Sequence, residues 1–504
     1  MLFNSIDFMI FFPIVVAVYF VIPKSLRGGG RTAWLLIASY YFYMSWNPAY
    51  ALLIAGSTLV TFISGILIER CSGAEDSQNN HYKRMVLILC LMINLGILGV
   101  FKYGNFLIDS ANEVLSIFHI TTISRRFDLL LPVGISFYTF QALGYIIDVY
   151  RNDIKAEKNI VRYALFVSFF PQLVAGPIER SKNLLSQIQN ISKIKLWNAK
   201  RVTSGAILMV WGYFMKMVIA DRVSLLVDTV FDNYRMYGST ELIIAAIGFS
   251  IQIYCDFGSY SLIAIGAAKI RGFELMENFN TPYFAHNIRD FWSRWHISLS
   301  TWFRDYLYIP LGGNRKGKVR KAANLMIVFL VSGLWHGADW RFVAWGGIHG
   351  FYQVAADFLQ PYRVKIQEKL KIKTNCFSWS FLQVIVTFGL VAFAWIFFRS
   401  DSIADALRFI KRIFMKPTPW LLFNGGIFKL GLDRVEMNIL VFSILLLILV
   451  DLVRYKKKVT IDVFLMEQNL WFEWAAVMGI IVMIFIFGEY GASFDAQQFI
   501  YFQF

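Results

Sequence analysis

A series of long apolar runs, separated by short basic segments, is the feature that most constrains how this chain can fold. A membrane-spanning helix needs about 20 mostly apolar residues. Runs of this kind predict spans near 8–23, 32–47, 49–68, 85–101, 129–147, 202–220, 241–267, 322–338, 341–358, 379–398, 436–453 and 470–488. The fold class that we predict is therefore all-α, a polytopic transmembrane helical protein with about 11–12 spans.

The composition supports a bilayer environment over a soluble one. Of the 504 residues, 57% are hydrophobic and only 16% are charged, whereas soluble domains carry roughly a quarter charged residues. No stretch outside the apolar runs is long enough for a soluble domain. We therefore predict one membrane domain over 1–504, with the main motifs in 131–350 and C-terminal spans in 379–504.

The net charge of +16 has a membrane explanation. In a soluble chain it would suggest nucleic acid, which we do not expect as a partner here. If the N-terminus is extracytoplasmic and the spans alternate, the inside loops hold 35 Lys and Arg and the outside segments hold 13. This bias follows the positive-inside rule and predicts a multi-pass protein of the cell membrane with both termini outside. The basic segment 399–435, assigned outside, fits least and could contain a missed half-span.

Other local patterns restrict the chemistry. The four cysteines are far apart and none forms a C-x-x-C pair, so neither a disulfide framework nor a zinc site is expected. His286 and His296 lack metal-ligand spacing, and we expect no metal and no bound cofactor. The first apolar run, Phe8 to Ile22, lacks the flanks of a cleaved signal and predicts a retained span. The stretch 163–178 is short and contains Pro171, Gly176 and Pro177, which favours a re-entrant segment.

Residues 290–310 form the segment that most resembles a site. Wound as one helix, 291–307 places its aromatic residues on one half and its Ser, Thr, Arg and Asp residues on the other. This pattern predicts an interfacial helix on the cytoplasmic side. His296 lies on the aromatic face. It is either an edge histidine bonded to a neighbour or a functional group, because ionisable residues at membrane depth are functional candidates.

Two further histidines and two carboxylates have open interpretations. His336, in LVSGLWHGADW, lies near the end of a predicted span between Gly333 and Gly337. It could meet a carbonyl or a headgroup, or act as a general base at the mouth of a cavity, since imidazole titrates near neutral pH. His349, in GGIHG, we interpret as a packing residue. Asp256 and Glu179 could line a cavity or be paired structural carboxylates.

At these residues the chain resembles the membrane-bound O-acyltransferase (MBOAT) family. Within it, the chain is similar to the bacterial branch that includes the alginate O-acetylation membrane protein. The similar segments include LPVGISFYTFQALGYIIDVY at 131–150, FFPQLVAGPIER at 169–180, DFWSRWHISLSTWFRDYLYIPLGG at 290–313, LWHGADW at 334–340 and the ending FIYFQF. They are long, and they run through most of the chain.

The resemblance implies a fold, an activity and a site. The implied fold is a ring of spans around a central tunnel, with re-entrant and interfacial helices. The implied active-site histidine is His336, and the second histidine of the site is His296. The implied donor is a cytosolic thioester, acyl-CoA (acetyl-CoA) or an acyl carrier protein thioester. The implied acceptor is a hydroxyl of an extracytoplasmic glycan, reached directly or through a separate SGNH-type transferase outside the membrane.

Basic residues near the interfacial helix are candidates for donor binding. The loop 269–321 holds ten Lys and Arg, and we select Arg315, Lys316 and Lys318. They could attract the phosphates of CoA or an acidic carrier, or they could bind anionic lipid.

Two other function classes compete with this interpretation. One is a transporter of an acylated or lipid-linked glycan, which would normally show inverted repeats. The other is an acyltransferase whose acceptor stays in the bilayer.

Overall fold

The computed structural model describes residues 1–71, 77–124, 127, 131–195 and 197–490, and no strand occurs among them. The described chain divides into two compact units. Unit 1 comprises Met1–Ala206 and Ile263–Met276, and unit 2 comprises Ile207–Leu262 and Glu277–Phe504. The single domain expected over 1–504 stays a prediction, and the ending FIYFQF lies outside the described residues.

The all-α, polytopic class is confirmed. Within the described part of the chain, seven helical stretches are long and apolar enough to cross a bilayer: Tyr50–Arg70, Gln78–Ile117, Ala199–Asp232, Ser239–Ile270, Phe377–Arg399, Arg434–Lys457 and Leu470–Phe487. The other predicted spans fall on α1 (Ile6–Val21), α2 (Gly29–Met44), α6 (Ile135–Tyr150), α14 (Gly317–His336) and α15 (Trp340–Lys369), which are not among the stretches long and apolar enough to cross a bilayer. The total of about 11–12 spans and the ring around a tunnel therefore stay predictions.

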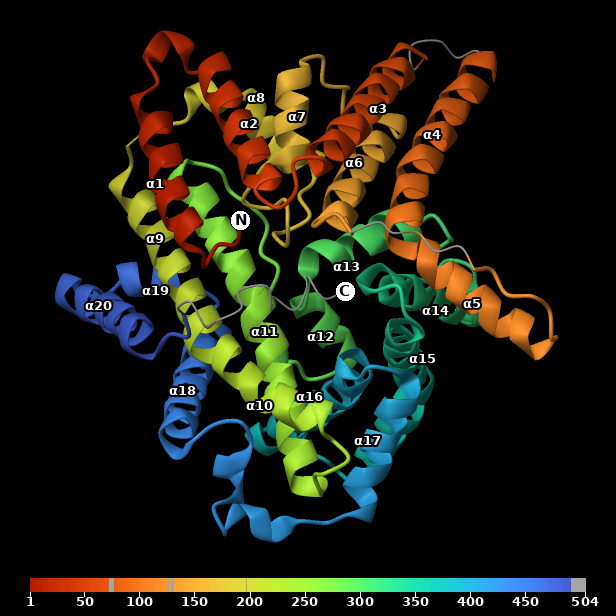
Figure 1. Ribbon diagram of the computed structural model, residues 1–504, viewed down its shortest axis with the longest axis vertical. Coiled ribbons are helices and arrows are strands. Elements are labelled where there is room, and N and C mark those ends of the chain that lie inside the picture. Colours follow the sequence, from red (N-terminus) through yellow and green to blue (C-terminus); the bar gives the residue numbers. More distant parts are fainter. Residues whose placement is uncertain (72–76, 125–126, 128–130, 196, 491–504) are drawn as a thin grey trace. The chain divides into compact units, whose positions relative to one another are not determined.

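Unit 1 is a group of packed helices (Figure 1). Helix α3 packs against α6, and α2 packs against α7. Gly65 permits the first contact, because a Cβ there would lie 2.9 Å from the Tyr145 hydroxyl. The helices of this unit are α1 (Ile6–Val21), α2 (Gly29–Met44), α3 (Tyr50–Arg70), α4 (Ser77–Leu98), α5 (Gly104–Ile117), α6 (Ile135–Tyr150), α7 (Ile160–Ser168), α8 (Ser181–Gln189) and the start of α9 (Ala199–Phe214).

The interrupted stretch 163–178 is irregular, as its prolines predict. Helix α7 ends at Ser168, and a buried non-helical segment follows. Gln141 and Gln172 both donate to the Phe166 carbonyl, at 2.6 and 3.1 Å. These side chains satisfy a backbone acceptor that a regular helix would satisfy itself. Whether the segment re-enters the bilayer stays a prediction.

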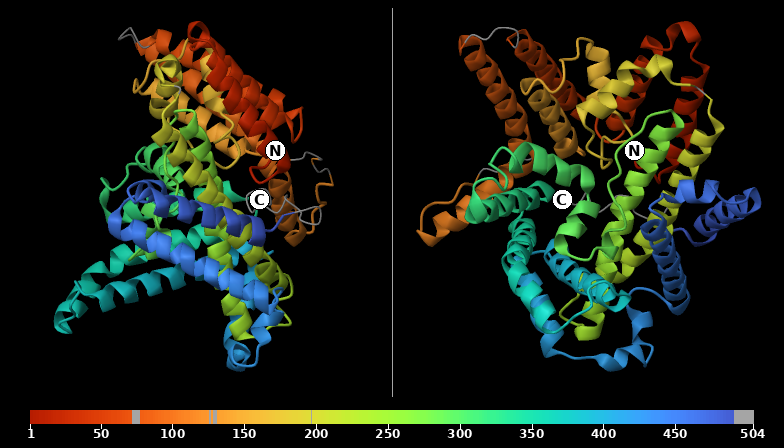
Figure 2. Two further views of the ribbon diagram at one scale, coloured as in Figure 1. Left: turned by 90° about the vertical axis from the view of Figure 1, so that its left-hand side faces the viewer. Right: turned by 180° about the vertical axis from the view of Figure 1, so that it is seen from behind.

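Unit 2 contains His286, His296, His336 and His349. Its helices are α10 (Asp221–Asp232), α11 (Ser239–Ile270), which extends into unit 1, α12 (Ile288–Arg294), α13 (Ile297–Phe303), α14 (Gly317–His336), α15 (Trp340–Lys369), α16 (Phe377–Arg399), α17 (Ile403–Met415), α18 (Arg434–Lys457), α19 (Ile461–Met466) and α20 (Leu470–Phe487). Helices α15 and α16 contact each other and are joined through 370–376 as a helical hairpin (Figure 2). The basic segment 399–435 contains α17, whose 13 residues are too few for a span.

Candidate functional site

His336 is the last residue of α14, and close helix packing sets its position. Helices α14 and α15 lie side by side (Figure 1). A Cβ on Gly333 would lie 2.1 Å from the Phe342 carbonyl oxygen, and one on Gly346 would lie 2.2 Å from the Phe329 carbonyl oxygen. Only glycine allows this approach. Because the chain becomes extended at Gly337, with φ −158°, His336 lies at the turn between the two helices.

His296 does not lie within a helix, so the prediction of one continuous helix over 291–307 is wrong. Helix α12 ends at Arg294, and α13 begins at Ile297. Between them His296 has φ 44° and ψ 53°, a left-handed conformation in which His is enriched among non-glycine residues. A further break follows Phe303, where the chain continues as a π-helical turn.

Backbone hydrogen bonds from a distant segment explain the break at His296. The Ile297 N–H donates to the Asn278 carbonyl, and the Asn280 N–H donates to the Arg294 carbonyl, both at 2.9 Å. The Asn278 side chain also accepts from the Ser298 hydroxyl at 2.6 Å. These bonds replace the i to i−4 pattern that a continuous helix would need. The aromatic periodicity of the segment contains no signal for this pairing.

The structure brings the two predicted histidines together. The ring centroids of His296 and His336 lie 6.2 Å apart, with an interplanar angle of 61°. Both residues are buried, with exposed fractions of 0% and 4%. Burial lowers the pKa of His296 from 6.5 to about 3, so this imidazole is neutral at physiological pH.

Aromatic rings surround the pair. Phe257 contacts His296 at 4.7 Å between centroids, Trp345 contacts His336 at 5.1 Å, and Trp335 contacts both histidines. Such walls exclude water, and polar interactions strengthen in a dry site. The pair is therefore suited to proton transfer or to orienting a reacting hydroxyl.

His349 has the surroundings of a packing residue. It is fully buried, and its Nδ1 accepts a hydrogen bond of 3.2 Å from the Trp292 indole N–H. Its ring stacks on Phe291 with an interplanar angle of 8° and meets Trp345 edge-on. These contacts support the packing interpretation and show that His349 holds Trp292 in place.

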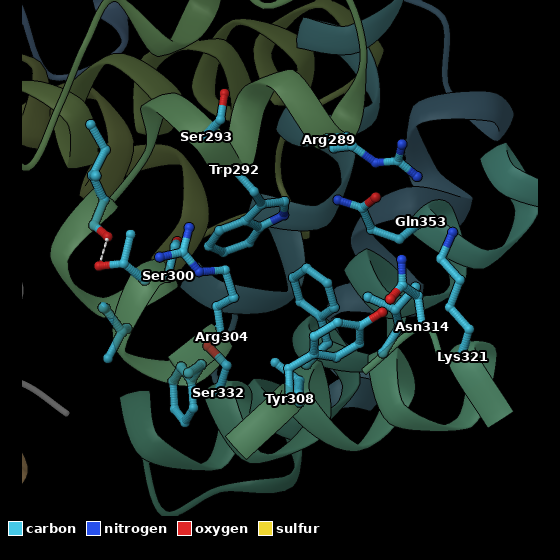
Figure 3. Close-up of a pocket in the computed structure, with 17 residues that line it drawn as sticks. Arg289, Trp292, Ser293, Ser300, Arg304, Tyr308, Asn314, Lys321, Ser332 and Gln353 are labelled. Carbon is cyan, nitrogen blue, oxygen red and sulfur yellow. Dashed lines mark hydrogen bonds between the residues drawn. The ribbon is translucent and has the colours of Figure 1, made fainter. Parts of the chain in front are cut away.

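A cavity of about 560 Å³ is lined by residues close in sequence to both histidines, although neither histidine is among its lining residues. Ile297, which follows His296, is in its wall. Ser332, one turn before His336, is in the wall as well (Figure 3). Trp292, Leu299, Phe303, Leu325, Val328 and Phe329 supply apolar surface, and the polar lining residues are Arg289, Ser293, Ser300, Thr301, Arg304, Tyr308, Asn314, Lys321 and Gln353. This volume and mixed lining suit an organic ligand with an anionic end. We call this space the histidine cavity.

The histidine cavity is lined by three cations that were not among the residues selected from the sequence. Arg289 and Lys321 both pair with the carboxylate of Asp357, and Arg304 pairs with Asp305 at 2.8 Å. The only signal in the sequence was their membership of the basic loop 269–321. The residues that we selected from that loop lie elsewhere. Arg315 and Lys316 are exposed in the turn before α14 and are not cavity-lining residues, and Lys318 lines a second cavity.

The buried residues Lys216, Asp256 and Glu179, outside the histidine cavity, have polar partners. Lys216, on a π-helical turn at Met215–Ala220, forms salt bridges with Asp256 and, at 2.8 Å, with Asp221. In unit 1, Glu179 accepts from the Asn183 amide at 2.7 Å and from a backbone N–H. Both carboxylates therefore fit the structural interpretation. Among the described residues, no group of three or more His, Cys, Asp or Glu could hold a metal ion.

Comparisons with known proteins point to one family. The model of the membrane-bound O-acyltransferase family matches residues 154–399. The chain is 36% identical to a probable alginate O-acetylase AlgI of Pseudomonas aeruginosa over 448 residues, 89% of this chain and 81% of that protein. It is 34% identical to a peptidoglycan O-acetyltransferase of Helicobacter pylori, covering 82% and 79% of the two chains. It is 26% identical to a teichoic acid D-alanyltransferase of Bacillus subtilis, covering 54% and 69%.

Proposed function

Because this chain belongs to the membrane-bound O-acyltransferase family, we propose that it moves an acetyl group from a cytosolic thioester to hydroxyls of an extracytoplasmic polysaccharide. The observation that carries the proposal is the pair of buried imidazoles, with ring centroids 6.2 Å apart, whose near neighbours Ile297 and Ser332 line a cavity with cationic and apolar walls. The relatives named for alginate and peptidoglycan O-acetylation support a glycan acceptor.

His336 is the proposed general base. It accepts the proton of the acceptor hydroxyl while the hydroxyl oxygen attacks the thioester carbonyl carbon. The carbon–sulfur bond then breaks, and the thiolate takes up the proton, so the products are an ester and a free thiol. Proton transfer of this kind typically contributes about 10²–10⁴-fold in rate.

His296 is the proposed orienting residue on the donor side. Because burial keeps its imidazole neutral, it can donate through one ring nitrogen and accept through the other. A neutral group suits a role in polarising or positioning a carbonyl in a dry site. His349 acts one step further away, through its hydrogen bond to the cavity-wall residue Trp292.

The histidine cavity is the proposed donor site. A CoA or a carrier-linked thioester has an anionic end and an apolar arm, which match the cations and the aromatic wall of the cavity. The cavity-lining Arg289, Arg304 and Lys321 are better placed for direct contact than Arg315, Lys316 and Lys318. Arg315, Lys316 and Lys318 would attract the anionic donor over a longer range. Transfer would go directly to the glycan or through a separate SGNH-type transferase outside the membrane.

Reconstitution tests the proposal. The purified protein is placed in sealed vesicles, and radiolabelled acetyl-CoA is supplied to one side, with alginate or peptidoglycan fragments on the other, in the presence and absence of an SGNH-type transferase. We expect hydroxylamine-labile label on the glycan with the wild-type protein and none with His336→Gln. Label found on lipid, with none on glycan in the presence of the partner transferase, would refute the polysaccharide acceptor.

A further inference from the structure

A second cavity, of about 640 Å³, lies along the first part of α14 and the second half of α15. Its lining residues are Lys318, Val319, Lys321, Ala322, Leu325, Val354, Asp357, Phe358, Gln360, Pro361 and Tyr362. Only Lys321 and Leu325 also line the histidine cavity. We call this second space the α14–α15 groove, and of its lining residues only Lys321 is a proposed donor contact.

The walls of the groove are apolar and open. Val319 is 86% exposed, Phe358 is 69% exposed and Tyr362 is 55% exposed. Apolar side chains this exposed are costly in water, but in a membrane protein acyl chains cover them. Tyr362 also fits the interface, where aromatic rings with a polar end are enriched. The groove is therefore shaped for a hydrocarbon chain.

One end of the groove carries positive charge. Lys318 is exposed, and no carboxylate lies within salt-bridge distance of it in the described part of the chain. Lys321 is partly neutralised by Asp357. Beyond the groove, α15 continues into a basic segment with Arg363, Lys365 and Lys369. Clusters of this kind beside spanning helices attract anionic headgroups.

From these observations, we propose that the α14–α15 groove binds an anionic phospholipid, with its phosphate on Lys318 and Lys321 and an acyl chain against Val319, Phe358 and Tyr362. Free inorganic phosphate would gain nothing from the apolar wall. The acidic surface of a carrier protein would need the lysines but not an open groove lined by Phe358. Because the groove combines lysines with an open apolar wall, it favours an anionic lipid.

Matched variants of the full chain test the proposal. Lys318→Gln removes a groove cation, and Lys316→Gln removes a neighbouring exposed cation outside the groove. Phe358→Ala removes part of the wall, and Phe351→Ala removes a ring that is 63% exposed on the same helix but outside the groove. All four side chains are exposed, so equal melting temperatures are expected and serve as the folding check.

The measurement is the retention of phosphatidylglycerol relative to phosphatidylcholine by the purified protein in native mass spectrometry. We expect Lys318→Gln to lower this ratio about fivefold, the value for one cation near a headgroup, and Lys316→Gln to leave it unchanged. Phe358→Ala should reduce the retention of both lipids, and Phe351→Ala should not.

Three results would overturn the proposal. In one, the two lysine variants, or the two phenylalanine variants, behave alike. In another, excess inorganic phosphate displaces the lipid, which would indicate a site for free phosphate. In the third, Lys318→Gln and Phe358→Ala abolish binding of an acidic carrier protein but leave lipid retention unchanged, which would assign the groove to a protein partner.

Discussion

The ring centroid of His296 lies 6.2 Å from that of His336. His296 lies in a break between two short helices, whereas His336 is the last residue of α14. The contact depends on two separate features. The backbone bonds of Asn278 and Asn280 produce the break, and Gly333 and Gly346 allow α14 and α15 to approach. A histidine in a regular helix over 291–307 would have had a different position.

Substitution of His336 tests the general base. We expect His336→Ala and His336→Gln to lower acyl transfer by about 10²–10⁴-fold, because neither residue can accept the hydroxyl proton. Glutamine can still hydrogen-bond, so a purely structural role predicts that the glutamine variant stays active. Radiolabel on the glycan is the measurement, and His119→Gln, in a loop, is the control. A glutamine variant with near wild-type transfer would contradict the mechanism.

Substitution of His296 separates packing from orientation. If the imidazole only fills an aromatic site beside Phe257 and Trp335, His296→Phe should keep its activity. We expect instead that His296→Phe and His296→Gln both lose most of the transfer rate while protein yield and melting temperature change little. A fully active phenylalanine variant would show that His296 has no role in acyl transfer.

The low pKa of His296 predicts a dependence of stability on pH. In the folded protein burial holds the pKa at about 3, compared with 6.5 for an ordinary histidine. The unfolded chain therefore binds a proton that the folded chain does not, and the stabilising contribution, complete above pH 6.5, is lost as the pH falls toward 3. Between pH 7.5 and pH 5, the loss of melting temperature of the detergent-solubilised protein should be smaller for His296→Phe than for the wild type. Equal losses in both proteins would contradict this assignment.

The cations of the histidine cavity predict a donor phenotype. Arg289→Gln combined with Lys321→Gln should raise the KM for acetyl-CoA by roughly tenfold, with little change in kcat. The charge-matched control, Arg315→Gln combined with Lys316→Gln, removes two cations that do not line the cavity, and we expect a smaller rise. A larger rise in KM from the control pair would indicate that the donor binds at the turn before α14.

The bias of basic residues predicts the topology. In a cysteine-free background, a cysteine placed within 361–373 should resist an impermeant thiol reagent in intact cells, because this segment, the end of α15 and the connection after it, is assigned to the cytosol. A cysteine near the N-terminus should react. Labelling of the 361–373 position from outside would refute the orientation.

Local sequence was sufficient for the helical class and for most helix positions, whereas the choice of His336 came from the family resemblance and stays a prediction. Apolar run length predicts spans because a bilayer has a fixed thickness. The turn after His336 follows from Gly337 and from Asp339, which caps α15 by accepting from the Arg341 N–H. These effects involve residues near one another in the chain.

Contacts between distant segments decided the rest. The break at His296 depends on hydrogen bonds from 278–280, which the periodicity of 291–307 does not encode. Counting charges found the basic loop but selected Arg315, Lys316 and Lys318, whereas Arg289, Arg304 and Lys321 line the histidine cavity. Which side of a loop faces a cavity depends on helix packing, and packing is a property of the assembled fold.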